Sequence, residues 1–257
     1  MTRNPRENLL VPDAEADLYL IGLGIGGFDS RSVEVDSVLA QCDTILHLTA
    51  FDDDLRGHYS ANVENLLPLY SSSDNAEEVY TEMMEHVYRV AVDSLGRGAT
   101  SFLSYGHPLF LVDTNWMLLA KSVSSGLRVK SIAATSFLDQ ALCDLGRRFD
   151  FGVQYYESKF FMDHEVVIDS RMPLLLSQIG DFGDVTLRQT KQKYRRLEPL
   201  FGVIRNSYPS ERKCYVVFSP WRRDMGPQIR EAQIGSIETL ISSIHVGCSF
   251  YVEGLYD

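Results

Sequence analysis

The sequence lacks the features that mark secreted, membrane-spanning and metal-bound proteins. Its four cysteines, Cys42, Cys143, Cys214 and Cys248, form no C-x-x-C pair, so we expect neither a disulfide framework nor a metal site. They are predicted to be buried as small apolar side chains. No run of about eighteen apolar residues occurs, so no membrane span is predicted. Residues 1–16 contain no apolar core of signal-peptide length and predict a flexible leader on a cytoplasmic protein.

Basic charge is scarce as well. The 257 residues carry 24 Lys and Arg against 35 Asp and Glu, a formal net charge of −11. Proteins that bind nucleic acid usually present a basic field to the phosphates, so no nucleic-acid partner is expected. An anionic small substrate is opposed less strongly, because a local group of arginines can outweigh the global deficit. The candidate groups are Arg147–Arg148, Arg195–Arg196 and Arg222–Arg223, although charged residues of this kind usually lie on a solvated surface.

What the sequence does contain is a regular alternation of apolar segments with helix-like ones from Asp17 onward. This alternation is typical of an α/β fold with a largely parallel sheet. Strands are predicted at residues 18–23, 44–48, 100–105, 127–132, 153–156, 173–178, 213–218 and 248–252. Helices are predicted at 31–41 with Ser30 as N-cap, from Asp74 or Asn75 to about 95, and at 116–124, 137–145 and 187–201. Because the pattern changes near Ala133, two α/β domains are predicted, 17–132 and 133–257.

A glycine-rich segment, Gly22-Leu23-Gly24-Ile25-Gly26-Gly27, follows the first predicted strand. Glycine permits positive φ angles and close approach of the backbone to a ligand. The spacing G-x-G-x-x-G, with Asp52 after the second strand, makes a dinucleotide-dependent dehydrogenase one alternative. In that fold the glycine turn opens the helix directly, whereas Phe28-Asp29-Ser30 intervenes here. A tight turn that binds no ligand is the other alternative.

Three further polar or small-residue segments follow predicted strands, where ligands bind in parallel α/β sheets. The first is Tyr105-Gly106-His107-Pro108-Leu109-Phe110, in which His107 either exchanges a proton with a ligand or packs within the turn. The second is Ala134-Thr135-Ser136-Phe137, in which Ser136 either contacts a ligand or caps the following helix. The third is Gln178, whose amide reaches backbone groups or those of a ligand.

Taken in order, the segments GLGIGG, YGHPLF, TSFLDQALCDLG, GVQYYESKFF and LSQIG resemble the tetrapyrrole-methylase-type fold of S-adenosylmethionine-dependent methyltransferases. The resemblance covers about residues 17–255. Tyr-Gly-His-Pro resembles the borosin peptide-backbone N-methyltransferases and their relatives. Porphyrin and corrin methylases usually carry Gly-Asp-Pro at that point and GxGPGDP in the first loop, and this chain has neither.

The resemblance implies two α/β domains with the methyl donor, S-adenosylmethionine, bound in the cleft between them. It implies no metal, and it implies a homodimer. The donor-binding residues that it implies are Tyr105, Gly106, His107, Pro108, Phe110, Ser136, Gln178, Phe218 and Ser219. Gly22, Gly24 and Gly26 are implied to face the substrate.

Two tyrosines are the candidates for residues that act on the methyl acceptor. A sulfonium methyl group transfers by in-line displacement, so alignment of the acceptor supplies on the order of 7–11 kcal/mol. If the acceptor is an amide nitrogen, a tyrosine phenol or phenolate and a cation would polarise the amide. Borosin methylases use tyrosines and an arginine between the second strand and the next helix, and the segments around Tyr70 and Tyr80 resemble the two ends of that region. The resemblance therefore implies Tyr70 and Tyr80 as catalytic residues. The intervening residues 71–77 contain neither Arg nor Tyr.

Three hypotheses follow. The first is a methyltransferase that acts on a peptide or peptide-like intermediate supplied in trans, because the chain ends at Asp257, just after its last predicted strand. The second is a methyltransferase whose acceptor is a tetrapyrrole or another small molecule. The third is a non-catalytic scaffold that retains donor binding. The dehydrogenase ranks behind all three.

Overall fold

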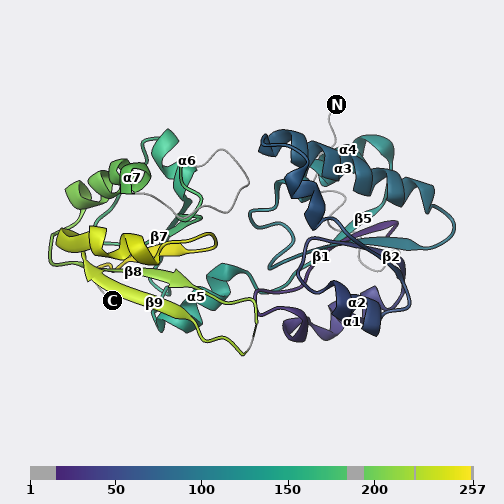
Figure 1. Ribbon diagram of the computed structural model, residues 1–257, viewed down its shortest axis with the longest axis horizontal. Helices are drawn as coiled ribbons and strands as arrows, with labels where there is room; N and C mark the ends of the chain where they lie inside the picture. The colour runs from purple at the N-terminus through teal and green to yellow at the C-terminus, as the bar shows by residue number, and fades with distance from the viewer. Residues whose placement is uncertain (1–15, 184–193, 223, 256–257) are drawn as a thin grey trace. The chain divides into compact units, whose positions relative to one another are not determined.

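The computed structural model describes residues 16–183, 194–222 and 224–255, which form two compact units (Figure 1). The first unit runs from Ala16 to Phe137 and includes Trp221 and Arg222. The second unit comprises the described residues from Leu138 to Pro220 and from Asp224 onward. The predicted leader lies outside the described residues apart from Ala16, which is buried.

The first unit is built on a five-stranded sheet in which every pair of neighbouring strands is parallel. In spatial order the strands are β3 (Asn62–Asn65), β2 (Cys42–His47), β4 (Ala99–Ser104), β1 (Leu18–Gly22) and β5 (Val129–Ile132). Because all five run in one direction, the loops that follow them emerge at one edge of the sheet. That edge carries the glycine-rich segment and the Tyr-Gly-His-Pro segment.

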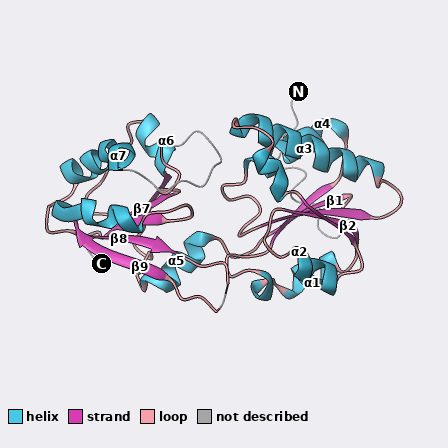
Figure 2. Ribbon diagram, viewed as in Figure 1, coloured by secondary structure: helices cyan, strands magenta, loops and turns pink. Residues whose placement is uncertain are grey.

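Helices cover both faces of this sheet (Figure 2). On one face lie α1 (Val33–Leu39) and α2 (Asp52–His58), and on the other lie α3 (Ala76–Asp93) and α4 (Asp113–Ser125). In α3, Val79, Met83 and Val87 are fully buried at helical spacing, and burial of each such side chain contributes about 1.5–3 kcal/mol. The helix begins at the predicted cap, since the Asn75 side chain accepts the Glu77 N–H at 3.0 Å.

The predicted start of the first helix is wrong by two residues. Ser30 ends a 3₁₀ turn, η2 (Phe28–Ser30), and Ser32 caps α1 by accepting the Val35 N–H at 3.1 Å. The Arg31 guanidinium donates to the Phe28 carbonyl at 2.8 Å while the Arg31 backbone is extended. The chain therefore completes one turn before the helix can begin.

The second unit contains a mixed five-stranded sheet. Its order is β6 (Gln154–Glu157), β7 (Leu174–Ser177), β10 (Ser249–Val252), β8 (Lys213–Phe218) and β9 (Gln228–Gln233). Only β6 and β7 pair in parallel. A core of buried side chains from this sheet, α6 (Ser158–Asp163), α7 (Tyr194–Ser207) and η4 (Ile234–Ser243) holds the unit together. The predicted basic helix 187–201 lies outside the described residues as far as residue 193.

Three of the four cysteines are buried as predicted, and all four are free thiols. Cys143 is the exception, because its position on α5 (Phe137–Leu145) is exposed. Among the described residues, no helix has the length and apolarity needed to cross a membrane. The same residues contain no group of three or more His, Cys, Asp or Glu side chains arranged to hold a metal ion.

Candidate functional site

The loops that follow β1 and β4 are joined by an isolated antiparallel bridge between Gly24 and Gly106. The Gly24 N–H donates to the Gly106 carbonyl at 3.1 Å, and the Gly106 N–H returns a bond at 3.4 Å. The Tyr105 hydroxyl adds a bond of 2.6 Å to the Ile25 carbonyl. Both bridging glycines have positive φ, 85° and 72°, which other residues rarely adopt. The glycine-rich segment and the Tyr-Gly-His-Pro segment are thus held together by hydrogen bonds.

A third loop, which follows β5, joins them at Gly22. A Cβ atom added to Gly22 would lie 2.7 Å from Pro108 Cδ and 2.8 Å from Ala134 Cβ, and closer still to the Gly106 carbonyl oxygen. One Cβ added to Gly24 would lie 2.9 Å from Thr135 Oγ1. Ser136 is also buried at this point. The glycines therefore permit three strand-end loops to pack directly on one another.

The Phe110 ring, in the loop after β4, contacts the Phe137 ring, with centroids 5.5 Å apart. Gly26 is half-buried, and a Cβ added there would collide with the Ser30 side chain. The glycine at position 27 has φ of 81° and faces the Phe51 ring and the Trp221 carbonyl. Except for Tyr70 and Tyr80, the predicted site residues of the first half thus lie in these three loops or, for Gly22, at the end of β1.

Two side chains of helix α4 hold the Tyr-Gly-His-Pro loop by hydrogen bonds. Asn115 Nδ2 donates to the Pro108 carbonyl at 2.6 Å, and Trp116 Nε1 donates to the Leu109 carbonyl at 3.2 Å. Within the loop, His107 Nδ1 accepts the Leu109 N–H at 3.1 Å, which leaves the proton of the neutral ring on Nε2. Neither Asn115 nor Trp116 is among the site residues predicted from the sequence. The available signal was an Asn-Trp pair at the start of a helix directly after the loop.

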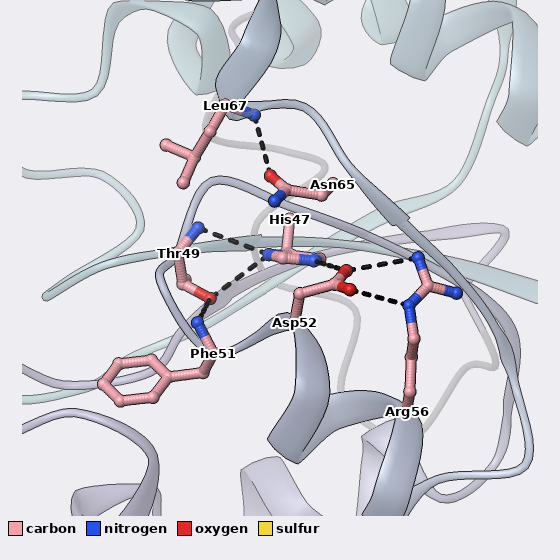
Figure 3. A network of polar contacts seen from close by, with 7 residues as sticks. All are labelled: His47, Thr49, Phe51, Asp52, Arg56, Asn65 and Leu67. Carbon is pink, nitrogen blue, oxygen red and sulfur yellow. Dashed lines mark hydrogen bonds and ion pairs between the residues drawn. The ribbon is translucent and has the colours of Figure 1, made fainter.

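Asp52, the candidate ribose ligand of the dehydrogenase alternative, has other partners (Figure 3). His47 Nε2 lies 2.9 Å from Asp52 Oδ1, and Arg56 donates to both carboxylate oxygens at 2.7 and 3.2 Å. His47 is fully buried, and its Nδ1 accepts the Thr49 N–H at 3.3 Å. The Arg56 and His47 hydrogen bonds hold the pKa of Asp52 below its usual value. This carboxylate therefore serves the fold at the end of β2.

Tyr70 and Tyr80, the catalytic residues that the resemblance implies, are in contact with each other. Tyr70 lies in η3 (Leu67–Ser71) and Tyr80 in α3, and their rings meet edge to face with centroids 6.4 Å apart. Burial, with smaller contributions from Tyr80 and Asp113, raises the pKa of Tyr70 to about 12. Tyr70 is therefore a neutral phenol near pH 7, able to donate a hydrogen bond, and the phenolate form is disfavoured.

The three candidate residues of the second unit occupy the ends of β7 and β8. Gln178 has a positive φ of 56° and an exposed side chain, and its carbonyl accepts the Asp181 N–H at 3.1 Å. The Phe218 ring packs edge-on against His245 with centroids 4.7 Å apart, beside a cavity of about 290 Å³. The Ser219 hydroxyl donates to Asp144 at 2.5 Å.

Two of the candidate arginines, Arg147 and Arg148, already have acidic partners. Arg147 pairs with Glu253 at 2.5 Å and also bonds the Tyr215 hydroxyl at 2.8 Å. Arg148 pairs with Asp150 at 2.8 Å. Arg223 lies outside the described residues. Arg147 and Arg148 are thus engaged by acidic neighbours of the same unit.

Comparison with known proteins agrees with this architecture. Residues 17–189, well over half of the chain, match the model of the tetrapyrrole (corrin/porphyrin) methylases. No curated protein matches the sequence. Among solved structures, a uroporphyrin-III-C-methyltransferase from Thermus thermophilus matches with a TM-score of 0.66 and 14% identity, over 93% of this chain and 94% of that one. A cobalt precorrin-4 methyltransferase matches with a TM-score of 0.63 and 14% identity, over 96% and 99%.

A third structure is the Thermus thermophilus uroporphyrin-III C-methyltransferase in complex with S-adenosylhomocysteine. It matches with a TM-score of 0.61 and 12% identity, over 93% of this chain and 98% of that one. The chain belongs to the tetrapyrrole methylase family. It is thus a methyltransferase of the kind that uses S-adenosylmethionine, and the predicted fold class, enzyme class and methyl donor are confirmed. The dehydrogenase alternative is wrong.

Proposed function

We propose that the chain transfers the methyl group of S-adenosylmethionine to a small-molecule acceptor, with tetrapyrroles as the first class to test. The observation that carries this proposal is the junction of three strand-end loops through Gly22, Gly24 and Gly106, in a chain of the tetrapyrrole methylase family. The structural relatives named above support the acceptor class, because they are uroporphyrin and precorrin methyltransferases.

The donor contacts are proposed residue by residue. In the first unit they are Tyr105, Gly106, His107, Pro108, Phe110 and Ser136, and in the second Gln178, Phe218 and Ser219. Backbone groups fixed by the Gly24–Gly106 bridge would orient the sulfonium so that the methyl group points at the acceptor. This alignment is worth on the order of 7–11 kcal/mol, so it supplies most of the catalysis without a strong general base.

Among tetrapyrroles, the acceptor is proposed to be one that carries fewer carboxylates than uroporphyrin. Arg147 and Arg148 are each paired with an acidic neighbour, and the net charge of the chain is −11. A polycarboxylate would have to displace these pairs and approach a chain of the same sign, which is electrostatically unfavourable.

A peptide acceptor supplied by a separate molecule is the second candidate, favoured by the Tyr70–Tyr80 pair. If the Tyr70 phenol donates to a peptide carbonyl, Tyr70→Phe should lower kcat by about 10²–10⁴-fold with little change in donor affinity. On a tetrapyrrole acceptor, the same variant should retain most of its activity. We propose a homodimer in both cases, which light scattering tests.

The experiment has two stages. Isothermal titration calorimetry with S-adenosylhomocysteine tests donor binding, and its absence would overturn the proposal. Mass spectrometry then compares tetrapyrroles, neutral small molecules and synthetic peptides for the mass increase of one methyl group. Methylation of peptides alone would replace the first candidate with the second, and donor binding without any transfer would favour a non-catalytic scaffold.

A further inference from the structure

We infer that Asn115 and Trp116 of α4 are positioning residues for the methyl donor. This inference rests on the proposed function, in which the loop 105–110 contacts the donor. Asn115 and Trp116 donate side-chain hydrogen bonds to two consecutive carbonyls of that loop, those of Pro108 at 2.6 Å and Leu109 at 3.2 Å. A helix thereby fixes the orientation of two adjacent peptide groups in a segment that lies outside the helices and strands.

The Asn115 side chain is poorly explained by stability alone. Its residue is fully buried, and its Oδ1 has no hydrogen-bond partner among the described residues. The reversed amide would bring two oxygens to 2.6 Å, so Nδ2 must face the Pro108 carbonyl. A buried unpaired oxygen is unfavourable, and an apolar side chain of similar shape would avoid it. Asn115 therefore retains an unfavourable atom while anchoring the loop.

Backbone strain directly after the loop also needs an anchor. Leu111 lies between the loop and α4. It has a positive φ of 59° although it is not glycine, and its side chain is exposed. Such a conformation persists only where surrounding contacts enforce it. The two bonds from α4 to residues 108 and 109 immediately precede this residue and constrain the chain entering it.

The test separates positioning from stability. Asn115→Leu exchanges the unpaired Oδ1 for an unpaired Pro108 carbonyl, so thermal unfolding should change little. Its Kd for S-adenosylhomocysteine should nevertheless rise about tenfold, because the loop carbonyls are no longer held in the orientation that suits the donor. Trp116→Phe keeps the ring at a half-exposed position and should raise the Kd roughly threefold. The matched control is Ser122→Ala, which removes a buried hydroxyl of the same helix that lacks a partner among the described residues.

The outcomes are distinct. Absence of binding by the wild-type chain would overturn the proposed function, and the inference with it. Wild-type affinity in Asn115→Leu and Trp116→Phe, or an equal loss in Ser122→Ala, would overturn the inference alone. If Asn115→Leu does not fold, the comparison of Trp116→Phe with Ser122→Ala decides. A kinetic readout adds to this, because a positioning role raises KM for the donor without raising KM for the acceptor.

Discussion

At Gly22 the absence of a side chain sets how closely three loops can approach. An added Cβ would lie within 2.8 Å of both Pro108 and Ala134. Gly22→Ala should therefore push the loops apart, lower the free energy of unfolding by about 1–3 kcal/mol and weaken donor binding. Chemical denaturation and calorimetry with S-adenosylhomocysteine measure the two effects.

The control is Gly57→Ala, because Gly57 lies in α2 with no atom near its added Cβ. Alanine should raise stability there by roughly 0.5–1 kcal/mol and leave donor affinity unchanged. If Gly22→Ala were as stable as Gly57→Ala, close packing of the loops at Gly22 would not be needed for stability, and the prediction would be wrong.

The phenol of Tyr70 predicts a pH dependence. In the unfolded chain its pKa is near 10, and burial raises it to about 12 in the fold. The folded state therefore holds this proton more tightly, so stability is fully present below pH 10 and falls as the pH rises towards 12. Tyr70→Phe should flatten this fall in urea titrations between these pH values. Curves for the two proteins that stay parallel would contradict the assignment.

Among single residues, the sequence made it possible to predict those of a type that stands out in a loop after a strand. The glycines at 22, 24 and 106 fall in this class, since positive φ or close approach demands them. Asn115 and Trp116 could not be recognised in the same way. Their role depends on which carbonyls the loop turns toward α4, and residue type and spacing do not determine that direction.

Among the elements, α2 depends on the network at the end of β2 (Figure 3). Asp52→Ala would leave the fully buried His47 Nε2–H without its acceptor, so stability should fall by about 1–3 kcal/mol. Arg56→Ala removes only an exposed i,i+4 pair, and the loss there should stay near 0.3–0.5 kcal/mol. Equilibrium unfolding in urea measures both values. Equal losses in the two variants would mean that His47 finds another partner.

Helices and strands were predicted correctly where their side chains are buried. Helix α5 begins and ends at the predicted residues, 137 and 145, and the buried strand β8 matches its predicted bounds, 213 and 218. By contrast β9, with the sequence QIREAQ, was missed, because an exposed edge strand has no apolar run. Helix α2 was missed as well, because its first turn is Asp52-Asp53-Asp54, a run that suits a helix N-terminus yet also suits a loop.

For the whole molecule, a ligand that binds only the folded state should raise its stability. S-adenosylhomocysteine at about 100 times its Kd should add about 2.7 kcal/mol to the free energy of unfolding. NADH at the same concentration should add nothing, since the only candidate ribose carboxylate, Asp52, is held by His47 and Arg56. Thermal shift measurements with both ligands test this. Stabilisation by NADH would contradict the family assignment of the cofactor.

The bond from Trp116 to the Leu109 carbonyl has an optical consequence. The chain contains two tryptophans, Trp116 and Trp221. Indole emission responds to the polarity and hydrogen bonding around the ring, so Trp116 is an intrinsic fluorophore attached to the loop 105–110. A Trp221→Phe background leaves it as the single emitter. Stopped-flow mixing could then follow the loop during ligand binding without any added dye.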